Sequence, residues 1–278
     1  MERIIINLDG ACESFVEEWL WAKGALSVES LPPHEPDRKL IALFDAQADQ
    51  NAFGQELDGA AAEFGGNILG LVFEEVNQEG WQEKWRDSFQ PLEVGQFRLV
   101  GDWEAEGDDS HLIRIYPGQA FGTGQHETTR LVIQAMTTLD MRGKRVLDAG
   151  CGTGILSIIA ERLGASDVFG FDVDPDCREN MECHLEMNKT RHVKLDIGVL
   201  EDFQLEPYDV ILANITINVL QQIWPQLPAL LKPDGVLLNS GILATQEDEA
   251  MEALADAGFR IGEVLRDDEW LMIEARPA

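Results

Sequence analysis

The stretch Val146-Leu147-Asp148-Ala149-Gly150-Cys151-Gly152-Thr153-Gly154 decides the fold of this chain. An apolar strand, Arg145–Ala149, runs into a turn with three alternating glycines, and an apolar helical segment at 155–163 follows immediately. Glycine allows positive φ and a close approach between backbone and ligand, and a helix N-terminus offers free N–H groups. The strand, turn and helix together predict a small-molecule site at the edge of a parallel sheet.

The spacing of the glycines distinguishes two classes of ligand. The dinucleotide fingerprint GxGxxG would place Ile155 at its third glycine, so a pyrophosphate site fits poorly. GxGxG with Asp148 two residues before Gly150 is similar to motif I of class I S-adenosylmethionine-dependent methyltransferases. Their ligand carries a positive sulfonium and ammonium instead of phosphate, and an acid near the turn suits that charge, directly or through water. A nicotinamide-dependent oxidoreductase is the alternative from another enzyme class.

A carboxylate ends the next predicted strand, at 168–172. Asp172 lies 22 residues after Gly150, where the acid of related dinucleotide folds accepts hydrogen bonds from ribose hydroxyls. We predict that role for Asp172, with an ordinary loop acid as the alternative. Asp174 and Pro175 are explained more simply, as the cap and first residue of the following helix.

An amide follows the apolar strand predicted at 208–213. Open α/β sheets bind ligands at the carboxyl ends of their strands, which is where Asn214 lies. Its side-chain oxygen can orient an attacking amine, so Asn214 is the predicted catalytic residue, and a turn-forming Asn is the alternative. The next residues, 215–217, lack the Pro-Pro-aromatic sequence of methyltransferases that act on bases or glutamine, which disfavours a flat, stacked substrate.

A Gly-rich loop precedes the helical run at 131–139. Residues 117–130 read PGQAFGTGQHETTR, which suggests a mobile cover over a pocket, with Thr128 or Thr129 capping the helix. This loop resembles the PGxAFGTGxHxTT signature of the PrmA family, the ribosomal protein L11 methyltransferases. The resemblance continues in the linker at 81–95, in GCGTGIL, FDVDP and ANI, and in Leu231–Leu243.

The resemblance implies a cofactor, a substrate and a set of contacts. The cofactor is S-adenosylmethionine, with Phe121 and neighbouring glycines closing over its methionine end. The substrate is ribosomal protein L11, held by the N-terminal domain, while the linker lets the catalytic domain reach lysine side chains and the N-terminal α-amine. The predicted cofactor-binding residues are Phe121, Thr129, Gly150, Gly152, Gly154, Asp172 and Asn214.

Hydrophobic periodicity divides the chain into three parts. Residues 1–77 show βαββαβ order (3–8, 13–23, 26–31, 39–44, 50–64, 68–76), typical of a small ferredoxin-like α+β domain. Residues 78–92 place Trp81, Trp85 and Phe89 at helical spacing and predict a linker helix that Pro91 ends. Residues 93–278 alternate strands and helices and finish in a hairpin. They predict an α/β, Rossmann-like, seven-stranded class I methyltransferase domain.

The expected elements of this large domain follow the alternation of apolar strands and amphipathic helices. The expected strands are 97–100, 112–115, 145–149, 168–172, 193–197, 208–213, 236–240, 259–265 and 270–275. The expected helices are 131–139, 155–163, 175–188, 219–231 and 246–257.

The composition is strongly acidic. There are 51 Asp and Glu against 21 Lys and Arg, a net charge of −30, which disfavours tight, direct binding to nucleic acid and favours a basic protein partner. Simple solubility, or a salt-rich cytoplasm, explains the same excess. We expect a cytoplasmic protein, because neither a signal peptide nor a membrane-spanning run is apparent. A monomer is the expected state.

Cysteine and histidine usage points to no metal. Four cysteines form no CxxC pair, which is typical of free thiols in a reducing compartment, and five histidines lack metal-ligand spacing. His126 is better explained as a structural or solvated residue than as a catalytic base, and with no strong base in the sequence we expect water to accept the amine proton. A methyltransferase of another basic protein or small molecule, and a non-catalytic cofactor sensor, are further alternatives.

Overall fold

The computed structural model describes residues 2–9, 12, 16, 17, 19, 20, 23, 25, 27–34, 37–44, 50–63, 66–75, 89–104, 111–116, 122 and 124–278. The chain divides into two compact units, Met1–Asp87 and Ser88–Ala278. The expected linker helix lies outside the described residues up to residue 88, and the expected helix at 13–23 is described only in part.

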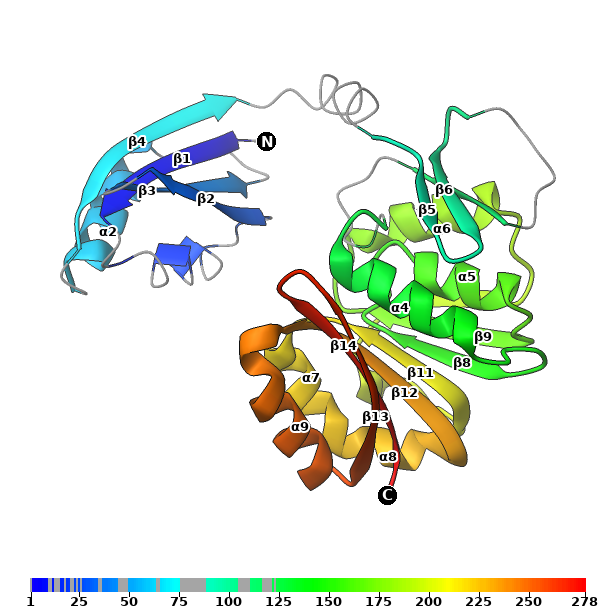
Figure 1. Ribbon diagram of the computed structural model, residues 1–278. Helices are drawn as coiled ribbons and strands as arrows, with labels where there is room; N and C mark the ends of the chain where they lie inside the picture. The colour runs from blue at the N-terminus through cyan, green and yellow to red at the C-terminus, as the bar shows by residue number, and fades with distance from the viewer. Residues whose placement is uncertain are drawn as a thin grey trace. The chain divides into compact units, whose positions relative to one another are not determined.

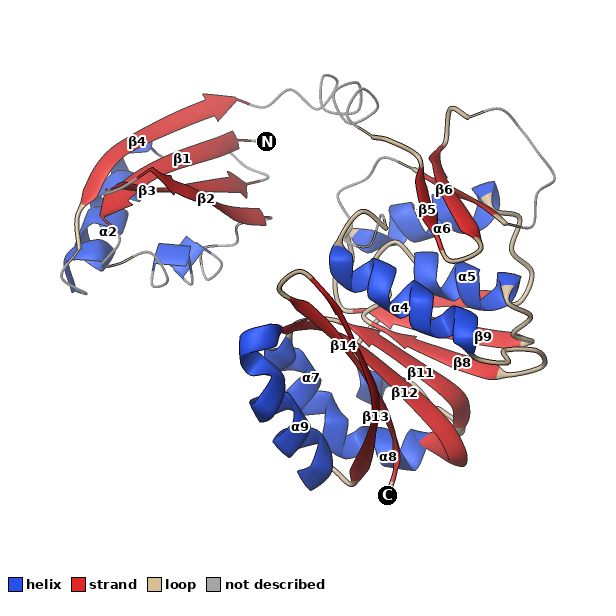
Figure 2. Ribbon diagram, viewed as in Figure 1, coloured by secondary structure: helices blue, strands red, loops and turns tan. Residues whose placement is uncertain are grey.

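The first unit is an antiparallel sheet with helical cover. Its elements are β1 (Glu2–Asp9), β2 (Ser27–His34), β3 (Asp37–Phe44), α2 (Gln50–Glu63) and β4 (Ile68–Glu75), and the strand order is β2-β3-β1-β4 (Figure 2). Ile4, Ile6 and Leu8 alternate along β1 and are fully buried together with Leu57 of α2. The order and the alternation agree with the small α+β domain expected from the sequence.

Strand β2 is longer than predicted. We expected it to end at Leu31, before Pro32 and Pro33, but it runs to His34, with a register shift between Leu31 and His34. The reason is its position: β2 is the edge strand and pairs only with β3, and proline is tolerated at a sheet edge because its missing N–H leaves no ladder bond unmade.

A small three-stranded sheet opens the second unit. It consists of β5 (Leu92–Val94), β6 (Phe97–Gly101) and β7 (Leu112–Ile115), with β5 antiparallel and β7 parallel to β6. The sequence predicted β6 and β7 but missed β5, and it did not reveal that the three strands form a sheet of their own. The sheet buries Phe97, Leu99, Ile113 and Ile115 completely.

The main sheet of the second unit has seven strands in the order β10-β9-β8-β11-β12-β14-β13. Only β14 runs antiparallel to its neighbours β12 and β13, as the final hairpin predicted. The strands are β8 (Arg145–Ala149), β9 (Asp167–Asp172), β10 (Val193–Ile197), β11 (Tyr208–Asn214), β12 (Leu231–Leu243), β13 (Phe259–Asp267) and β14 (Trp270–Pro277).

Helices cover both faces of this sheet. In Figure 1, α4 (Glu127–Thr138), α5 (Ile155–Arg162) and α6 (Cys177–Met187) lie on one face, and α7 (Ile217–Ile223), α8 (Leu227–Leu230) and α9 (Glu247–Asp256) lie on the other. The core between the sheet and the second set is continuous and includes the fully buried Trp224. No helix in the described part of the chain has the length and apolarity that a membrane span requires.

One expected helix and one expected strand differ from the structure. The helix predicted at 219–231 breaks into α7, a 3-10 turn at Trp224–Gln226 and α8, because Pro225 and Pro228 cannot donate within a helix. Strand β12 begins at Leu231 instead of Val236, and the register shift between these two pairing positions accommodates the turn around Pro233 and Gly235.

Candidate functional site

The glycine turn adopts a backbone conformation that other residues rarely reach. Gly150, Gly152 and Gly154 have φ values of 72°, 51° and 77°, in the left-handed region that costs a side chain roughly 1–2 kcal/mol. The N–H groups of Gly150 and Cys151 donate to the Phe171 carbonyl at 2.9 and 3.0 Å, which ties the turn to β9. Gly154 is the N-cap of α5. The turn is thus fixed between β8 and α5 as the sequence predicted.

Asp172 lies beside the turn, at the end of β9. One carboxylate oxygen accepts the Gly152 N–H at 2.8 Å and the other accepts the Asp174 N–H at 3.1 Å. A carboxylate offers about four acceptor sites, so two are left for a ligand such as a pair of ribose hydroxyls. The prediction that Asp174 caps the next helix and Pro175 is its first residue is wrong, because α6 begins at Cys177 and its N-cap is Asp176. Asp174 instead accepts the Asp176 N–H at 2.9 Å in the turn before the helix.

Asp148 is not among the described residues that line the cavity, and its Oδ1 is buried without a hydrogen-bond partner among the described residues, so its expected role near the charge of a ligand stays a prediction. Its side chain is fully buried, and one oxygen accepts a hydrogen bond from the Ser157 hydroxyl at 2.7 Å. Burial raises the pKa of this carboxyl to about 7, against the lowering effect of Ser157. One oxygen of Asp148 therefore joins β8 to α5 beside the glycine turn.

Asn214 is oriented by Thr129. The Asn214 amide donates from Nδ2 to the Thr129 hydroxyl oxygen at 3.1 Å, and both side chains are buried. The remaining amide atom, Oδ1, is buried without a hydrogen-bond partner among the described residues. A buried acceptor without a partner is costly in a folded protein and is expected where a ligand supplies the donor.

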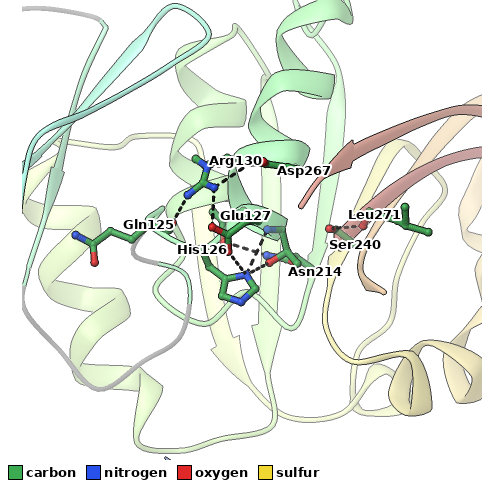
Figure 3. Close-up of polar contacts among 10 residues, drawn as sticks. Gln125, His126, Glu127, Arg130, Asn214, Ser240, Asp267 and Leu271 are labelled. Atoms are coloured by element: carbon green, nitrogen blue, oxygen red, sulfur yellow. Dashed lines mark hydrogen bonds and ion pairs between the residues drawn. The ribbon is translucent and has the colours of Figure 1, made fainter. Parts of the chain in front are cut away.

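The first turn of α4 is capped by His126, although we expected Thr128 or Thr129 in that role. His126 Nδ1 accepts the Thr128 N–H at 3.3 Å and lies 2.9 Å from the Thr128 hydroxyl oxygen. The His126 ring packs edge-on against Trp270, with 4.9 Å between ring centroids. Burial lowers the pKa of His126, and the Glu127 charge counteracts this only in part. Figure 3 shows His126 and Asn214 at the start of α4.

These groups surround a cavity of about 890 Å³ at the carboxyl ends of the parallel strands. Four predicted residues line it, namely Gly150, Gly152, Asp172 and Asn214. Two others do not line it: Thr129 is hydrogen bonded to Asn214, and Gly154 lies against Leu195. Phe121 lies outside the described residues.

Three residues that shape the cavity were not predicted from the sequence. Ile215 lies over the glycine turn, since a methyl group added at Gly150 would meet Ile215 Cγ2 at 2.2 Å. Gly241, with φ of 85°, passes so close to the Ile215 backbone that a Cβ would lie 2.3 Å from its carbonyl oxygen. Trp270 forms a wall from the far end of the chain. Only Gly241 had a local signal, a glycine in the last part of an apolar strand.

The charges of the cavity suit a cationic ligand that carries a ribose. Its charged wall residues are Asp172 and Glu201, and neither Lys nor Arg lines it among the described residues. The side chains of Val173, Val199 and Leu200 provide an apolar surface beside Asp172. A phosphate would find no cation in these walls, whereas a sulfonium nucleoside would find an acceptor for its sugar and an acidic environment. The residues therefore fit S-adenosylmethionine.

The sheet order, with one antiparallel strand, and the glycine turn beside Asp172 define a class I S-adenosylmethionine-dependent methyltransferase. The family model of PrmA, described as ribosomal protein L11 methyltransferase, matches residues 5–277. The chain belongs to this family, and it is a methyltransferase that uses S-adenosylmethionine.

Individual relatives agree with the family model. The chain is 35% identical over 276 residues to a ribosomal protein L11 methyltransferase of Pseudomonas paraeruginosa, covering 94% of this chain and 92% of the relative. It is 37% identical over 207 residues to the Acetivibrio thermocellus enzyme of the same name, covering 73% and 66%. The crystal structure of a ribosomal protein L11 methylase from Lactobacillus delbrueckii subsp. bulgaricus matches with a TM-score of 0.63 and 28% identity, covering 68% of this chain and 99% of that one.

The comparisons confirm the family resemblance, the fold class and the cofactor expected from the sequence. The family match also sets aside the oxidoreductase alternative.

Proposed function

We propose that this chain transfers methyl groups from S-adenosylmethionine to amines of ribosomal protein L11, at lysine side chains and at the N-terminal α-amine. The observation that carries the proposal is Asn214 Oδ1, a buried acceptor in the cavity wall without a partner among the described residues. The Nδ2 group donates to the Thr129 hydroxyl oxygen, which leaves Oδ1 as the amide atom available to a ligand. The site therefore offers an acceptor to an incoming N–H group.

Four residues would hold the cofactor in this proposal. Asp172 would accept the ribose hydroxyls, and the backbone of Gly150 and Gly152 would allow the methionine part to lie against the turn. Asn214 would face the methyl group, with Thr129 fixing its orientation. When bound, S-adenosylmethionine supplies an electrophilic methyl group on a positive sulfur.

The chain's contribution to the reaction is positioning. An amine hydrogen bonded to Asn214 Oδ1 keeps its lone pair free to point toward the methyl group, and good alignment of two reactants lowers a barrier substantially. A lysine with a pKa of about 10.4 must first lose a proton. His126 Nδ1 is engaged with Thr128 as a helix cap, so we propose that solvent at the cavity mouth takes this proton.

The first domain, at 1–77, is the proposed substrate-recognition unit. On β1, Ile4, Ile6 and Leu8 face the covering helix, so Ile5 and its cross-strand partners Ile41 and Val72 occupy the opposite face. Val72 is 45% exposed, and residues 1–77 hold 15 acidic against 4 basic side chains. An apolar sheet face in an acidic domain supports docking of a basic protein.

The rest of the assignment follows from the same proposal. Residues 78–92 would link the two domains, although the described end of this stretch, at 89–92, is not helical as predicted, because Leu92 already belongs to β5. Residues 93–278 would form the methyltransferase domain. We propose that the protein acts as a cytoplasmic monomer that meets newly made ribosomal protein, and not as a nucleic-acid or membrane protein.

Intact-mass spectrometry tests the proposed function. Unmethylated ribosomal protein L11 is incubated with the chain and S-adenosylmethionine at low and at high salt, and peptide mapping locates each modification. We expect mass gains in steps of one methyl group on lysines and on the α-amine. No gain at either salt, with cofactor binding demonstrated by calorimetry, would contradict the substrate and leave another basic protein as the candidate.

A further inference from the structure

Arg130 connects three segments that meet behind the cavity. It is the fourth residue of α4, and its side chain is 21% exposed. Its guanidinium donates to the Gln125 backbone carbonyl, to Glu127 at 2.8 Å, and to Asp267 from Nη2 at 3.0 Å and Nε at 3.3 Å. Figure 3 shows these contacts converging on one side chain. We call Gln125, Glu127, Arg130 and Asp267 the Arg130 cluster.

Each contact of the cluster lies next to a residue of the candidate site. Gln125 immediately precedes His126, which lines the cavity. Asp267 is the cross-strand partner of Trp270, which also lines the cavity and packs against His126. The Arg130 guanidinium thus binds residues that adjoin His126 and pair with Trp270. Arg130 also follows Thr129, whose hydroxyl accepts the Asn214 hydrogen bond.

Other hydrogen bonds also hold the β13–β14 hairpin near its turn. The Ala244 N–H donates to the Glu269 carbonyl at 2.8 Å, and the Ser240 hydroxyl donates to the Leu271 carbonyl at 2.8 Å. These bonds join the hairpin to β12, whereas the Arg130 cluster joins it to α4 and to the loop before α4. Arg130 suits this task because its rigid fork of donors can serve several acceptors at fixed angles, which a lysine cannot do.

We propose that Arg130 is a positioning residue that sets the His126–Trp270 wall against Asn214, and so controls how the substrate amine is placed. Its hydrogen bonds go neither to the glycine turn nor to Asp172. It therefore acts on productive placement of the substrate and leaves cofactor affinity unchanged. The expected effect on turnover rests on the proposed function, whereas the expected effect of Arg130 on the position of His126 and Trp270 does not.

The test compares Arg130→Met, Arg130→Lys and a matched control, Arg142→Met. Arg142 lies just beyond the other end of α4 and pairs with the exposed Asp140 at 2.8 Å, so this control removes a guanidinium from the surface without affecting the cluster. Hydrogen exchange is followed in segments 124–126, 150–154 and 266–270. Calorimetry gives the Kd for S-adenosylmethionine, and turnover of ribosomal protein L11 gives kcat and KM.

For Arg130→Met we expect exchange at least threefold faster in 124–126 and 266–270 and unchanged in 150–154. The Kd for S-adenosylmethionine should stay within twofold of wild type, while kcat/KM falls at least tenfold. Arg130→Lys should lie between Arg130→Met and wild type, and it serves as the test if the Met variant does not fold. Arg142→Met should match wild type throughout.

Two results would overturn the inference. One is an Arg130→Met variant whose exchange in both segments equals that of Arg142→Met. The other is a loss of cofactor affinity as large as the loss of kcat/KM. If wild type itself transfers no methyl group to ribosomal protein L11, the proposed function fails, and the exchange comparison still decides whether Arg130 holds the wall.

Discussion

Alanine at Gly150 and at Gly143 separates backbone strain from crowding in the glycine turn. Gly150 has φ of +72° and Gly143 has φ of +70°, so each variant places a side chain in the same left-handed region. A Cβ at Gly143 would meet nothing within 4 Å, whereas one at Gly150 would lie 2.2 Å from Ile215 Cγ2. Gly143 is therefore a control that shares the strain and lacks the contact.

The expected magnitudes follow from these two terms. The left-handed conformation costs an alanine about 1.5 kcal/mol, which lowers the Tm of a domain of this size by roughly 5 °C. Moving Ile215 aside adds about 2 kcal/mol of overpacking, so Gly150→Ala should lower the Tm by roughly 10 °C. Because Ile215 lies next to Asn214 in the cavity wall, its displacement should also weaken cofactor binding in Gly150→Ala alone.

Calorimetry measures both quantities on the same samples. Scanning calorimetry gives each Tm, and titration with S-adenosylhomocysteine gives each Kd. We expect Gly143→Ala to bind as wild type does and Gly150→Ala to bind at least roughly tenfold more weakly, about 1.4 kcal/mol. Equal Tm losses in the two variants, with equal Kd values, would refute the argument from crowding against Ile215.

Three other predictions concern carboxylates and the amide. Asp172→Ala should weaken S-adenosylmethionine binding by about 2 kcal/mol, roughly 30-fold in Kd, through lost ribose hydrogen bonds. Asp174→Ala is the control, and calorimetry showing the same Kd for both variants would remove the ribose assignment. Asn214→Ala should lower kcat roughly 100-fold through misplacement of the amine, a far larger loss than its effect on the cofactor Kd; a wild-type rate in single-turnover assays would disprove its role. Burial raises the pKa of Asp148 to about 7, so the native state holds a proton that the unfolded state releases near pH 4. The free energy of unfolding of wild type relative to Asp148→Asn should therefore fall as pH rises from about 4 to 7, by up to about 4 kcal/mol, and stay level above pH 7. Denaturant titrations of both variants across this range check the trend, and a flat difference would contradict it.

Local sequence rules were sufficient for the cofactor side of the site. Glycines at alternate positions can turn a strand into a helix, and the ends of adjacent parallel strands must meet at one sheet edge. Gly150, Asp172 and Asn214 could therefore be placed together from the amino-acid sequence alone. The same rules predicted the seven-stranded sheet, because strands that alternate with helices have few ways to pair.

The substrate side of the site could not be predicted in this way. Trp270 contacts His126 although more than half of the catalytic domain's sequence separates them, and hydrophobic periodicity cannot predict a contact between residues so far apart in the sequence. The hydrogen bond from the Ser157 hydroxyl to Asp148 was equally hidden, because the position of an acid before the turn does not show which side chain of the following helix will contact it. His126 was missed as a cap because a histidine nitrogen is a less common cap acceptor than the hydroxyls of the threonines that follow it.

The position of β14 has a consequence for biosynthesis. This strand, Trp270–Pro277, inserts between β12 and β13, so β13 has no neighbour in the sheet until β14 has emerged from the ribosome. The units that precede it can fold during translation, but closure of the main sheet must wait for its final strand. Because that strand carries Trp270, the main sheet and this wall of the cavity are completed in the same step.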